Sequence, residues 1–394
     1  MSEKKFNIIG LTDSRHQFLS PDVCSIIREG KVFSGGKRHH EIVAGMLPAD
    51  VKWIDVKVPL SEVIKEYDDY NEIVVFASGD PLFYGYAVTL QREFPDSEIK
   101  VWPAFNSIQM LAHRLLLPYS SLVNVSLTGR SWDELDVALI EDRELIGVLT
   151  DKKKSPCDIA KRLLEYGYNN YRISVGERLG NEEESIYVLS LEEASIRQFK
   201  NPNCVILQQT SKRERFFGIP EQEFVHLEGR ENMITKMPVR LLALSMLALY
   251  GKRSFWDIGF CTASVSIEAK LQFPRLHITA FERREESKRL FEDNTRKFGV
   301  PGIECVIGDF MDTDLTAYSR PDSVFIGGHG GRLEEIIKKI SEVILPGGTI
   351  VFNSVKEETA FAFRKAVESV GMKVSESHLI TLDKHNPITI MKAI

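Results

Sequence analysis

Apolar residues occur along this chain in two patterns, as short continuous runs and as stretches that repeat at helical spacing. In the first half, the continuous runs at 6–11 and 72–78 predict buried strands, and the spacing within 154–166 predicts an amphipathic helix. In the second half, strands are expected at 254–259, 276–282, 303–309, 323–328 and 347–355. Strands that alternate with helices predict an α/β fold in both halves.

A charged segment at 211–224 separates the two patterns. It follows an expected strand at 203–209, contains a glycine and a proline, and has little periodicity, which is typical of a linker. A chain of 394 residues also exceeds what one hydrophobic core usually supports. The sequence therefore predicts two domains, 1–212 and 213–394, of which the second is a doubly wound sheet.

Composition narrows the class of protein. The chain is 43% apolar and 27% charged with a net charge of −6, which is typical of a soluble globular protein and argues against a general nucleic-acid binder. No apolar run approaches the roughly 20 residues of a membrane span, and no signal peptide is evident. Five scattered cysteines without CxxC spacing predict reduced thiols, and no histidine motif suggests a metal. A cytoplasmic protein without metal, membrane or nucleic-acid partner is expected.

In the second half, 255–264 predicts a strand, a turn of small residues and a helix. Small residues let the backbone approach a cofactor, and the helix offers free N–H groups. Glu282 ends the next strand, where a carboxylate can accept hydrogen bonds from ribose hydroxyls, and Asp309 ends the third. The plainer alternative is that Gly259 makes a tight turn and Glu282 caps a helix.

These signals in this order resemble the class I, seven-stranded methyltransferases that use S-adenosylmethionine, with a Rossmann-like fold. The resemblance implies a cofactor site formed by Gly259, Phe260, Cys261, Thr262, Ala263, Glu282, Asp309 and Phe310. The usual run is G-x-G-x-G, and here Cys261 and Ala263 replace two glycines. If either position has a positive φ, its Cβ costs roughly 1 kcal/mol or more.

Further motifs, MITKMPVR at 233–240, FIGGHGG at 325–331 and LPGGTIVFNSV at 345–355, resemble the decarboxylating precorrin methyltransferases of cobalamin biosynthesis. That family methylates carbon 15 and removes the acetate carboxyl at carbon 12. The resemblance implies that Thr235 contacts the cofactor. A loop beyond the fourth strand can hold substrate carboxylates through the backbone of Gly327, Gly328, Gly330 and Gly331, unless it is only a flexible turn. His329 is the candidate to supply or accept a proton.

In the first half, a buried strand ends in Gly79-Asp80-Pro81, and Asn106-Ser107 forms an N-cap-like pair before a helix. With the Gly-Gly-Lys-Arg-His run at 35–39, these motifs resemble the two-lobed tetrapyrrole methylase (class III) family, in the branch that methylates carbon 5 of precorrin. The resemblance implies a cofactor cleft between two lobes, formed by Gly79, Asp80, Pro81, Ser107, Leu149 and Thr150. Family members usually open with G-x-G-P, where this chain has Gly10-Leu11-Thr12-Asp13. We therefore expect Asp13 and Arg15 to alter substrate contacts.

The fused halves resemble bifunctional enzymes that methylate a precorrin twice. The substrate carries many carboxylates, so six basic residues are candidates for its capture, each with surface charge as the alternative: Lys37, Arg38, Arg130, Lys236, Arg240 and Arg332. Metal-free and cobalt-loaded precorrins both fit, and self-association is expected because both families tend to it. Two alternatives stay open. One is methylation of RNA or protein by the second half with an accessory lobe, and the other is a second half that is a non-catalytic scaffold.

Overall fold

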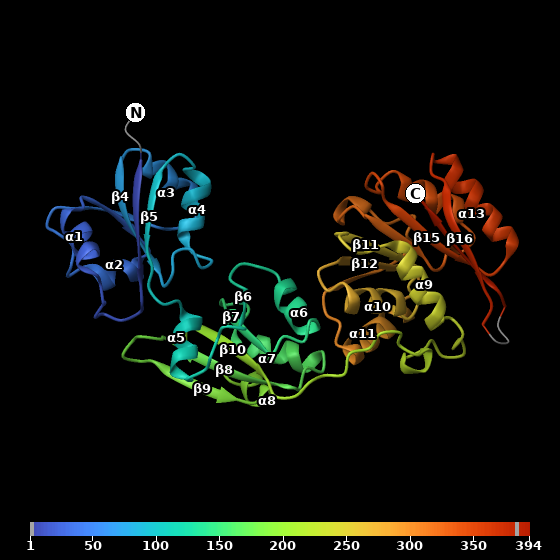
Figure 1. Ribbon diagram of the computed structural model, residues 1–394, viewed down its shortest axis with the longest axis horizontal. Helices are drawn as coiled ribbons and strands as arrows, with labels where there is room; N and C mark the ends of the chain where they lie inside the picture. Colours follow the sequence, from blue (N-terminus) through green and yellow to red (C-terminus); the bar gives the residue numbers. More distant parts are fainter. Residues whose placement is uncertain (1–3, 383–385) are drawn as a thin grey trace. The chain divides into compact units, whose positions relative to one another are not determined.

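A computed structural model describes residues 4–382 and 386–394 (Figure 1). Contacts divide the chain into two compact units. The first comprises the residues up to Arg130, Glu144–Lys161 and Tyr171–Thr210, and the second comprises Ser131–Arg143, Arg162–Asn170 and Ser211–Ile394. The α/β fold class predicted from the alternating pattern is confirmed in both.

The first sheet is wholly parallel and has the order β3-β2-β4-β1-β5. Its strands are β1 (Lys5–Leu11), β2 (Val32–Gly35), β3 (Lys52–Asp55), β4 (Glu72–Ser78) and β5 (Glu98–Trp102). Its helices are α1 (Pro21–Glu29), α2 (Lys37–Val43), α3 (Leu60–Tyr67) and α4 (Tyr86–Glu93). Residues of α1 pack on one face and those of α3 and α4 on the other. Strand β4 is therefore buried on both faces, which explains its continuous apolar run.

The second sheet has the order β6-β7-β10-β8-β9 and is antiparallel except for the β6–β7 pair. Its strands are β6 (Val123–Ser126), β7 (Leu145–Leu149), β8 (Tyr171–Glu177), β9 (Ser185–Leu189) and β10 (Asn203–Gln209). The helices in this part of the chain are α5 (Ser107–Arg114), α6 (Asp133–Ile140), α7 (Pro156–Glu165) and α8 (Leu191–Ser195). The buried face of α5 packs against β7 and β10.

The second unit holds a sheet of order β13-β12-β11-β14-β15-β17-β16, in which only β17 runs antiparallel to its neighbours. Its strands are β11 (Ser254–Ile258), β12 (His277–Glu282), β13 (Ile303–Ile307), β14 (Ser323–Ile326), β15 (Thr349–Ser354), β16 (Val374–Ile380) and β17 (Ile388–Ala393). Besides α6, which lies within Ser131–Arg143, its helices are η1 (Glu221–Glu223), α9 (Met237–Leu247), α10 (Ser264–Gln272), α11 (Glu286–Phe298), η2 (Leu315–Ala317), α12 (Leu333–Ser341) and α13 (Glu357–Ser369). Residues of α9 and α10 pack on one face of this sheet and those of α12 and α13 on the other.

The segment 211–224 is not a free linker as predicted. Ile219 and Phe224 are buried in the core of the second unit, against residues of α10 and α11. The backbone N–H groups of Gly218 and Ile219 donate to the Glu268 carboxylate at 2.6 and 3.1 Å. The segment is charged because many of its other side chains are exposed, while Ile219 and Phe224 anchor it and Phe216 packs against the same core.

Arg240 is predicted as a substrate-capturing cation, and the structure corrects this. Its side chain is fully buried, and its Nε donates to Glu268 at 3.1 Å. The remaining nitrogens donate to the carbonyl oxygens of Thr235, at 2.8 Å, and Ile219. All three guanidinium nitrogens therefore donate to groups of α10 and of the segment before α9. Arg240 has a structural role, because it joins these parts of the second unit.

This pair generates a stability prediction. We expect Arg240→Ala to lower the free energy of unfolding by about 3–5 kcal/mol, because it leaves a buried carboxylate without its cation. Arg289→Ala is the control, since the Arg289 side chain is 89% exposed, and it should change stability by about 0.5 kcal/mol or less. Urea unfolding measures both. Equal stability of the two variants, with weaker substrate binding by Arg240→Ala, would restore the capture role.

Candidate active sites

A cavity of about 540 Å³ lies in the first unit, between its two sheets. One wall comes from the carboxyl ends of β1 and β4 and from the segment before α5. The other comes from the end of β7 and the start of β10. Ligands of open α/β sheets bind at the carboxyl ends of parallel strands, and the volume is within the range of small-molecule sites.

Two glycines let the backbones around this cavity approach one another. A Cβ on Gly10 would overlap the carbonyl oxygen of Gly79 and lie 2.7 Å from the Ala104 nitrogen. A Cβ on Gly79, whose φ is +59°, would lie 2.9 Å from the Asn106 Cα. The Gly79 N–H donates to the Leu11 carbonyl at 2.7 Å. Neither glycine tolerates a side chain, so the ends of β1 and β4 and the start of α5 meet as bare backbone.

The predicted cofactor residues of this half separate into two groups. Gly79, Ser107, Leu149 and Thr150 line the cavity. Asp80 and Pro81 are not among its lining residues. The Asp80 carboxylate accepts the Leu82 N–H at 2.9 Å, and Pro81 is buried, so both shape the turn behind the cavity. The predicted N-cap is confirmed, since Asn106 Oδ1 accepts the Gln109 N–H at 2.9 Å.

The basic candidates also differ in position. Arg38 lines the cavity, and its Nε lies 3.3 Å from a carboxylate oxygen of Asp13, which lines it too. Lys37 is exposed at the start of α2 and does not line the cavity. The Arg130 guanidinium lies 4.9 Å above the ring of Tyr84, a lining residue, so it stands one side chain away from the cavity.

A second, smaller cavity of about 120 Å³ lies in the second unit at the carboxyl ends of β11 to β14. Gly259 follows β11 with a φ of +78°, and a Cβ there would lie 2.6 Å from the Gly328 nitrogen. The first and fourth strand ends therefore touch through backbone. Gly259, Glu282, Asp309 and Phe310 line this cavity, as do Gly328, His329, Gly330 and Arg332.

The two residues that replace glycines occupy the conformation that favours glycine. The φ angles of Cys261 and Ala263 are +49° and +59°, so each carries the expected backbone strain of roughly 1–2 kcal/mol. The Cys261 N–H donates to Glu282 Oε2 at 3.1 Å, and the neighbouring Phe260 ring packs against Phe291. Phe260, Cys261, Thr262 and Ala263 are all buried and support the turn from behind the cavity.

Each of the two carboxylates expected to hold the cofactor is paired with an arginine. Arg284 Nη1 lies 3.1 Å from each oxygen of Glu282, and Arg332 Nη1 lies 3.2 Å from Asp309 Oδ2. A volume of about 120 Å³ is below the roughly 300–1,000 Å³ of ligand pockets. Both arginine side chains are partly exposed, so they can move aside when a ligand enters.

Two buried polar atoms beneath this turn have no partner among the described residues, Asp257 Oδ1 and Thr262 Oγ1. Asp257 Oδ2 accepts the Ser266 hydroxyl at 2.6 Å, and burial raises the pKa of Asp257 to about 7. An unpartnered carboxylate oxygen and a glycine-built turn fit a ligand with amino and hydroxyl donors, as S-adenosylmethionine has. The set of cofactor residues predicted from the sequence omits Asp257, although the D-x-G motif contained the signal.

His329 lies in the glycine-rich loop beyond β14. Its Nδ1 accepts the Gly331 N–H at 3.2 Å, and burial lowers its pKa, so the ring is neutral with its proton on Nε2. Nε2 is therefore a hydrogen-bond donor, and protonation at Nδ1 would cost the contact to Gly331.

The other predicted residues of this half lie elsewhere. Thr235 and Lys236 precede α9 and do not line the cavity. The Thr235 carbonyl accepts a hydrogen bond from Arg240. Gly327 and Gly331 flank the lining residues of the loop, and the Gly327 N–H donates to the Ile258 carbonyl at 2.8 Å. Over residues 4–382 and 386–394, no group of three or more histidines, cysteines or carboxylates is placed to hold a metal ion. In the same part of the chain, every helix is too short or too polar to cross a bilayer.

Comparisons with known proteins match a separate family model to each half and a longer relative to most of the chain. The family model described as Tetrapyrrole (Corrin/Porphyrin) Methylases matches residues 8–195, and that described as Precorrin methyltransferase domain matches 227–393. A precorrin-6Y C(5,15)-methyltransferase (decarboxylating) of Sinorhizobium sp is 30% identical over 352 residues, covering 88% of this chain and 84% of that protein.

Shorter relatives match part of the chain. A cobalt-precorrin-6B C(15)-methyltransferase (decarboxylating) of Salmonella typhimurium is 39% identical over 132 residues, which cover 34% of this chain and 67% of that protein. Among solved structures, one of a precorrin-6Y C5,15-methyltransferase from Geobacter metallireducens GS-15 is 34% identical, with a TM-score of 0.42, and covers 45% of this chain and 97% of that chain.

The contact between Gly259 and Gly328 generates a prediction with a matched control. Gly251 has a φ of +77°, close to that of Gly259, but a Cβ there meets no atom within 4 Å. Alanine should therefore cost about 1–2 kcal/mol of stability at Gly251 from the positive φ alone, and more at Gly259, where the Cβ also meets the Gly328 backbone. Only Gly259→Ala should also abolish binding of S-adenosylhomocysteine to the second unit, as measured by calorimetry. Equal binding by the two variants would show that the close approach is unimportant.

Proposed function

The chain belongs to the family of decarboxylating precorrin-6Y C(5,15)-methyltransferases, and on that premise we propose that it methylates a precorrin at two carbons and removes one carboxyl group. The observation that carries the proposal is the match to a curated relative across 88% of the chain, which spans both units. Two separate glycine-built cavities, one in each unit, support two transfer sites. S-adenosylmethionine supplies both methyl groups.

We assign carbon 5 to a domain of residues 1–212 and carbon 15 with the decarboxylation to a domain of residues 213–394. The separate family models at 8–195 and 227–393 support this division. The smaller relatives named for the C(15) reaction support it as well, because they match this chain over about a third of its length.

In the first domain, Gly79, Ser107, Leu149 and Thr150 would hold the cofactor. Bound S-adenosylmethionine presents a methyl group on a sulfonium, which an electron-rich carbon attacks directly. The chain's part is to align the two partners and to exclude water, and an enclosed cavity between two sheets suits this. No strong base is needed, which agrees with a lining rich in backbone and neutral groups.

In the second domain, Glu282 and Asp309 would hold the ribose and adenine, and Asp257 Oδ1 would accept from the amino group. When the cofactor binds, Arg284 and Arg332 would release these two carboxylates. Arg332 and the N–H groups of His329 and Gly330 would hold acetate carboxylates of the substrate. The other N–H groups of the 327–331 loop already donate to the Ile258 carbonyl or to His329 Nδ1. When carbon dioxide leaves, the electron pair of the broken C–C bond passes into the macrocycle, and the acetate carbon takes up a proton.

His329 is the proposed catalytic residue of the decarboxylation, because its Nε2–H can donate a hydrogen bond at the edge of the cavity. We expect His329→Ala to slow methylation of carbon 15 and decarboxylation by about a hundredfold or more and to leave methylation of carbon 5 unchanged. His378→Ala is the control, since His378 lies exposed on β16 and pairs with Glu376. If single-turnover product analysis finds all reactions intact in His329→Ala, the role is wrong.

Two alternatives are weighed against this proposal. Methylation of RNA or protein has no support among the relatives described above. A second half that acts only as a scaffold would bind no S-adenosylhomocysteine, so calorimetry on residues 213–394 distinguishes it.

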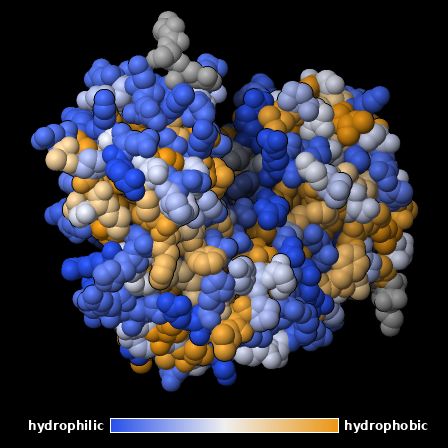
Figure 2. All heavy atoms as spheres, turned by 60° about the vertical axis from the view of Figure 1, so that its left-hand side comes forward, coloured by the Kyte–Doolittle hydropathy of each residue, from blue (hydrophilic) through white to orange (hydrophobic). Residues whose placement is uncertain are grey.

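We further infer that the protein is cytoplasmic, acts on a free tetrapyrrole without nucleic acid or membrane, and self-associates. Exposed apolar side chains of the first unit that do not line the cavity, including Val88, Leu116 and Ile196, support self-association. On the face shown in Figure 2, hydrophobic residues form separate patches among hydrophilic ones. Sedimentation of the full chain measures the oligomeric state.

Product mass tests the proposed function directly. With S-adenosylmethionine, the full chain should add two methyl groups to a precorrin-6Y and release one carbon dioxide. Metal-free and cobalt-loaded substrates are assayed in parallel to identify the preferred form. Gly79→Ala should prevent only the carbon 5 transfer, because its Cβ would intrude on Asn106. A wild-type product with one added methyl group, or with its carboxyl retained, would contradict the proposal.

A further inference from the structure

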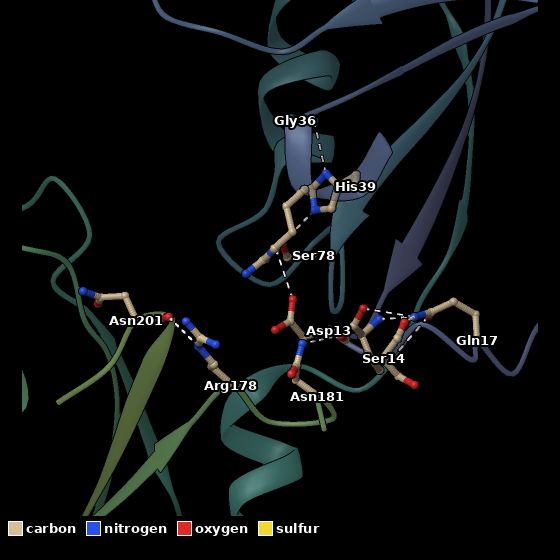
Figure 3. A network of polar contacts seen from close by, with 11 residues as sticks. Asp13, Ser14, Gln17, Gly36, His39, Ser78, Arg178, Asn181 and Asn201 are labelled. Carbon is tan, nitrogen blue, oxygen red and sulfur yellow. Dashed lines mark hydrogen bonds and ion pairs between the residues drawn. The ribbon is translucent and has the colours of Figure 1, made fainter. Parts of the chain in front are cut away.

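The hydroxyl of Ser78, at the end of β4, lies between two donors on α2 (Figure 3). The His39 Nε2 is 2.9 Å from Ser78 Oγ, and Arg38 Nη2 is also 2.9 Å from it. All three residues line the 540 Å³ cavity of the first unit. None of the sequence motifs assigned a role to Ser78 or His39.

The protonation of His39 follows from its contacts. The Gly36 N–H donates to Nδ1 at 3.2 Å, so Nδ1 carries no proton. Burial, and secondarily the nearby Arg38, lowers the pKa of His39 to about 4, so the ring is neutral. The single ring proton is therefore on Nε2, and Nε2–H donates to Ser78.

This assignment fixes the direction of the Ser78 hydroxyl. A hydroxyl oxygen accepts two hydrogen bonds, and those of Ser78 come from His39 and Arg38. Its own hydrogen then has no acceptor among the contacts within the described ranges 4–382 and 386–394. Because Ser78 is exposed and lines the cavity, this hydrogen is available to a ligand there.

Arg38 is held in place beside this donor. Its Nε faces Asp13 Oδ1 at 3.3 Å, and the Asp13 side chain is only 11% exposed. The Asp13 carbonyl in turn accepts from Asn181 at 3.4 Å. With Nε and Nη2 engaged, Nη1 remains to donate, and the Arg38 side chain is 44% exposed. A fixed guanidinium next to a fixed hydroxyl donor is complementary to an acceptor-only anion, that is, a carboxylate.

We propose that Ser78 and Arg38 together bind one carboxylate of the tetrapyrrole during the first methylation, with His39 and Asp13 as positioning residues. This rests on the proposed function and identifies a substrate subsite within it. The tetrapyrrole is preferred to the cofactor's own carboxylate because it carries many such groups, and because the partly exposed Arg38 can reach a large ligand that enters from solvent.

The test compares the Michaelis constants of the full-length chain for precorrin and for S-adenosylmethionine. Ser78→Ala should raise KM for the precorrin by about ten- to a hundredfold, the effect of a lost hydrogen bond to a charged group, with the affinity for S-adenosylhomocysteine unchanged. Ser78→Thr should restore most of the loss because it keeps the hydroxyl. Ser61→Ala, an exposed serine of α3, is the matched control and should behave as wild type.

The positioning role of His39 has a separate readout. His39→Leu should also raise KM for the precorrin, and His39→Gln less so, since its amide can still donate. Because His39 acts through Ser78, the double variant with Ser78→Ala should be no worse than Ser78→Ala alone. Additive losses would show that His39 acts independently and would overturn that part of the proposal.

The remaining outcomes separate the two claims. A wild-type chain that methylates precorrin while Ser78→Ala keeps a normal KM would overturn the subsite and leave the proposed function intact. A loss of affinity for S-adenosylhomocysteine in Ser78→Ala would assign the carboxylate to the cofactor and equally overturn it. A wild-type chain that neither binds nor methylates precorrin, by absorbance titration and product mass, would refute both.

Discussion

Contact between bare backbones at the ends of strands is the constraint on which both sites depend. In the first unit, Gly10 and Gly79 bring the ends of β1 and β4 together. In the second, Gly259 brings the end of β11 against Gly328. A side chain at any of these positions would fill the space that a ligand needs or push the strands apart. The two sheets have different topologies, but each obtains its site from this same approach.

The two units differ in the charge of the groups that line their cavities. The cavity of the first unit is lined mostly by backbone and neutral groups, together with the paired Arg38 and Asp13. The second unit presents Glu282 and Asp309, each neutralised by an arginine. It also tolerates Cys261 and Ala263 at positive φ. The Cys261 N–H is tied to Glu282, and the buried Phe260 holds the turn, so the surrounding structure maintains the strained backbone.

Continuous apolar strands were predictable from the sequence, and the roles of single polar residues were not. The runs at 72–78 and 203–209 coincide with β4 and β10 because these strands are buried on both faces. No apolar run indicated β16, since most of its residues are exposed. Arg240 reads as a free cation because sequence does not reveal that α9 turns it toward Glu268. The direction of the Ser78 hydroxyl depends on the tautomer of His39. That tautomer is fixed by the hydrogen bond from the Gly36 N–H, which the sequence does not reveal.

The central claim is that one chain carries two independent cofactor sites, and the number of S-adenosylhomocysteine molecules bound per chain tests it most directly. Equilibrium dialysis of the full-length protein should give two at saturation, one for each glycine-built cavity. Binding of a single molecule per chain would contradict the account, because it would leave one of the two strand-end contacts without the function for which its geometry is suited.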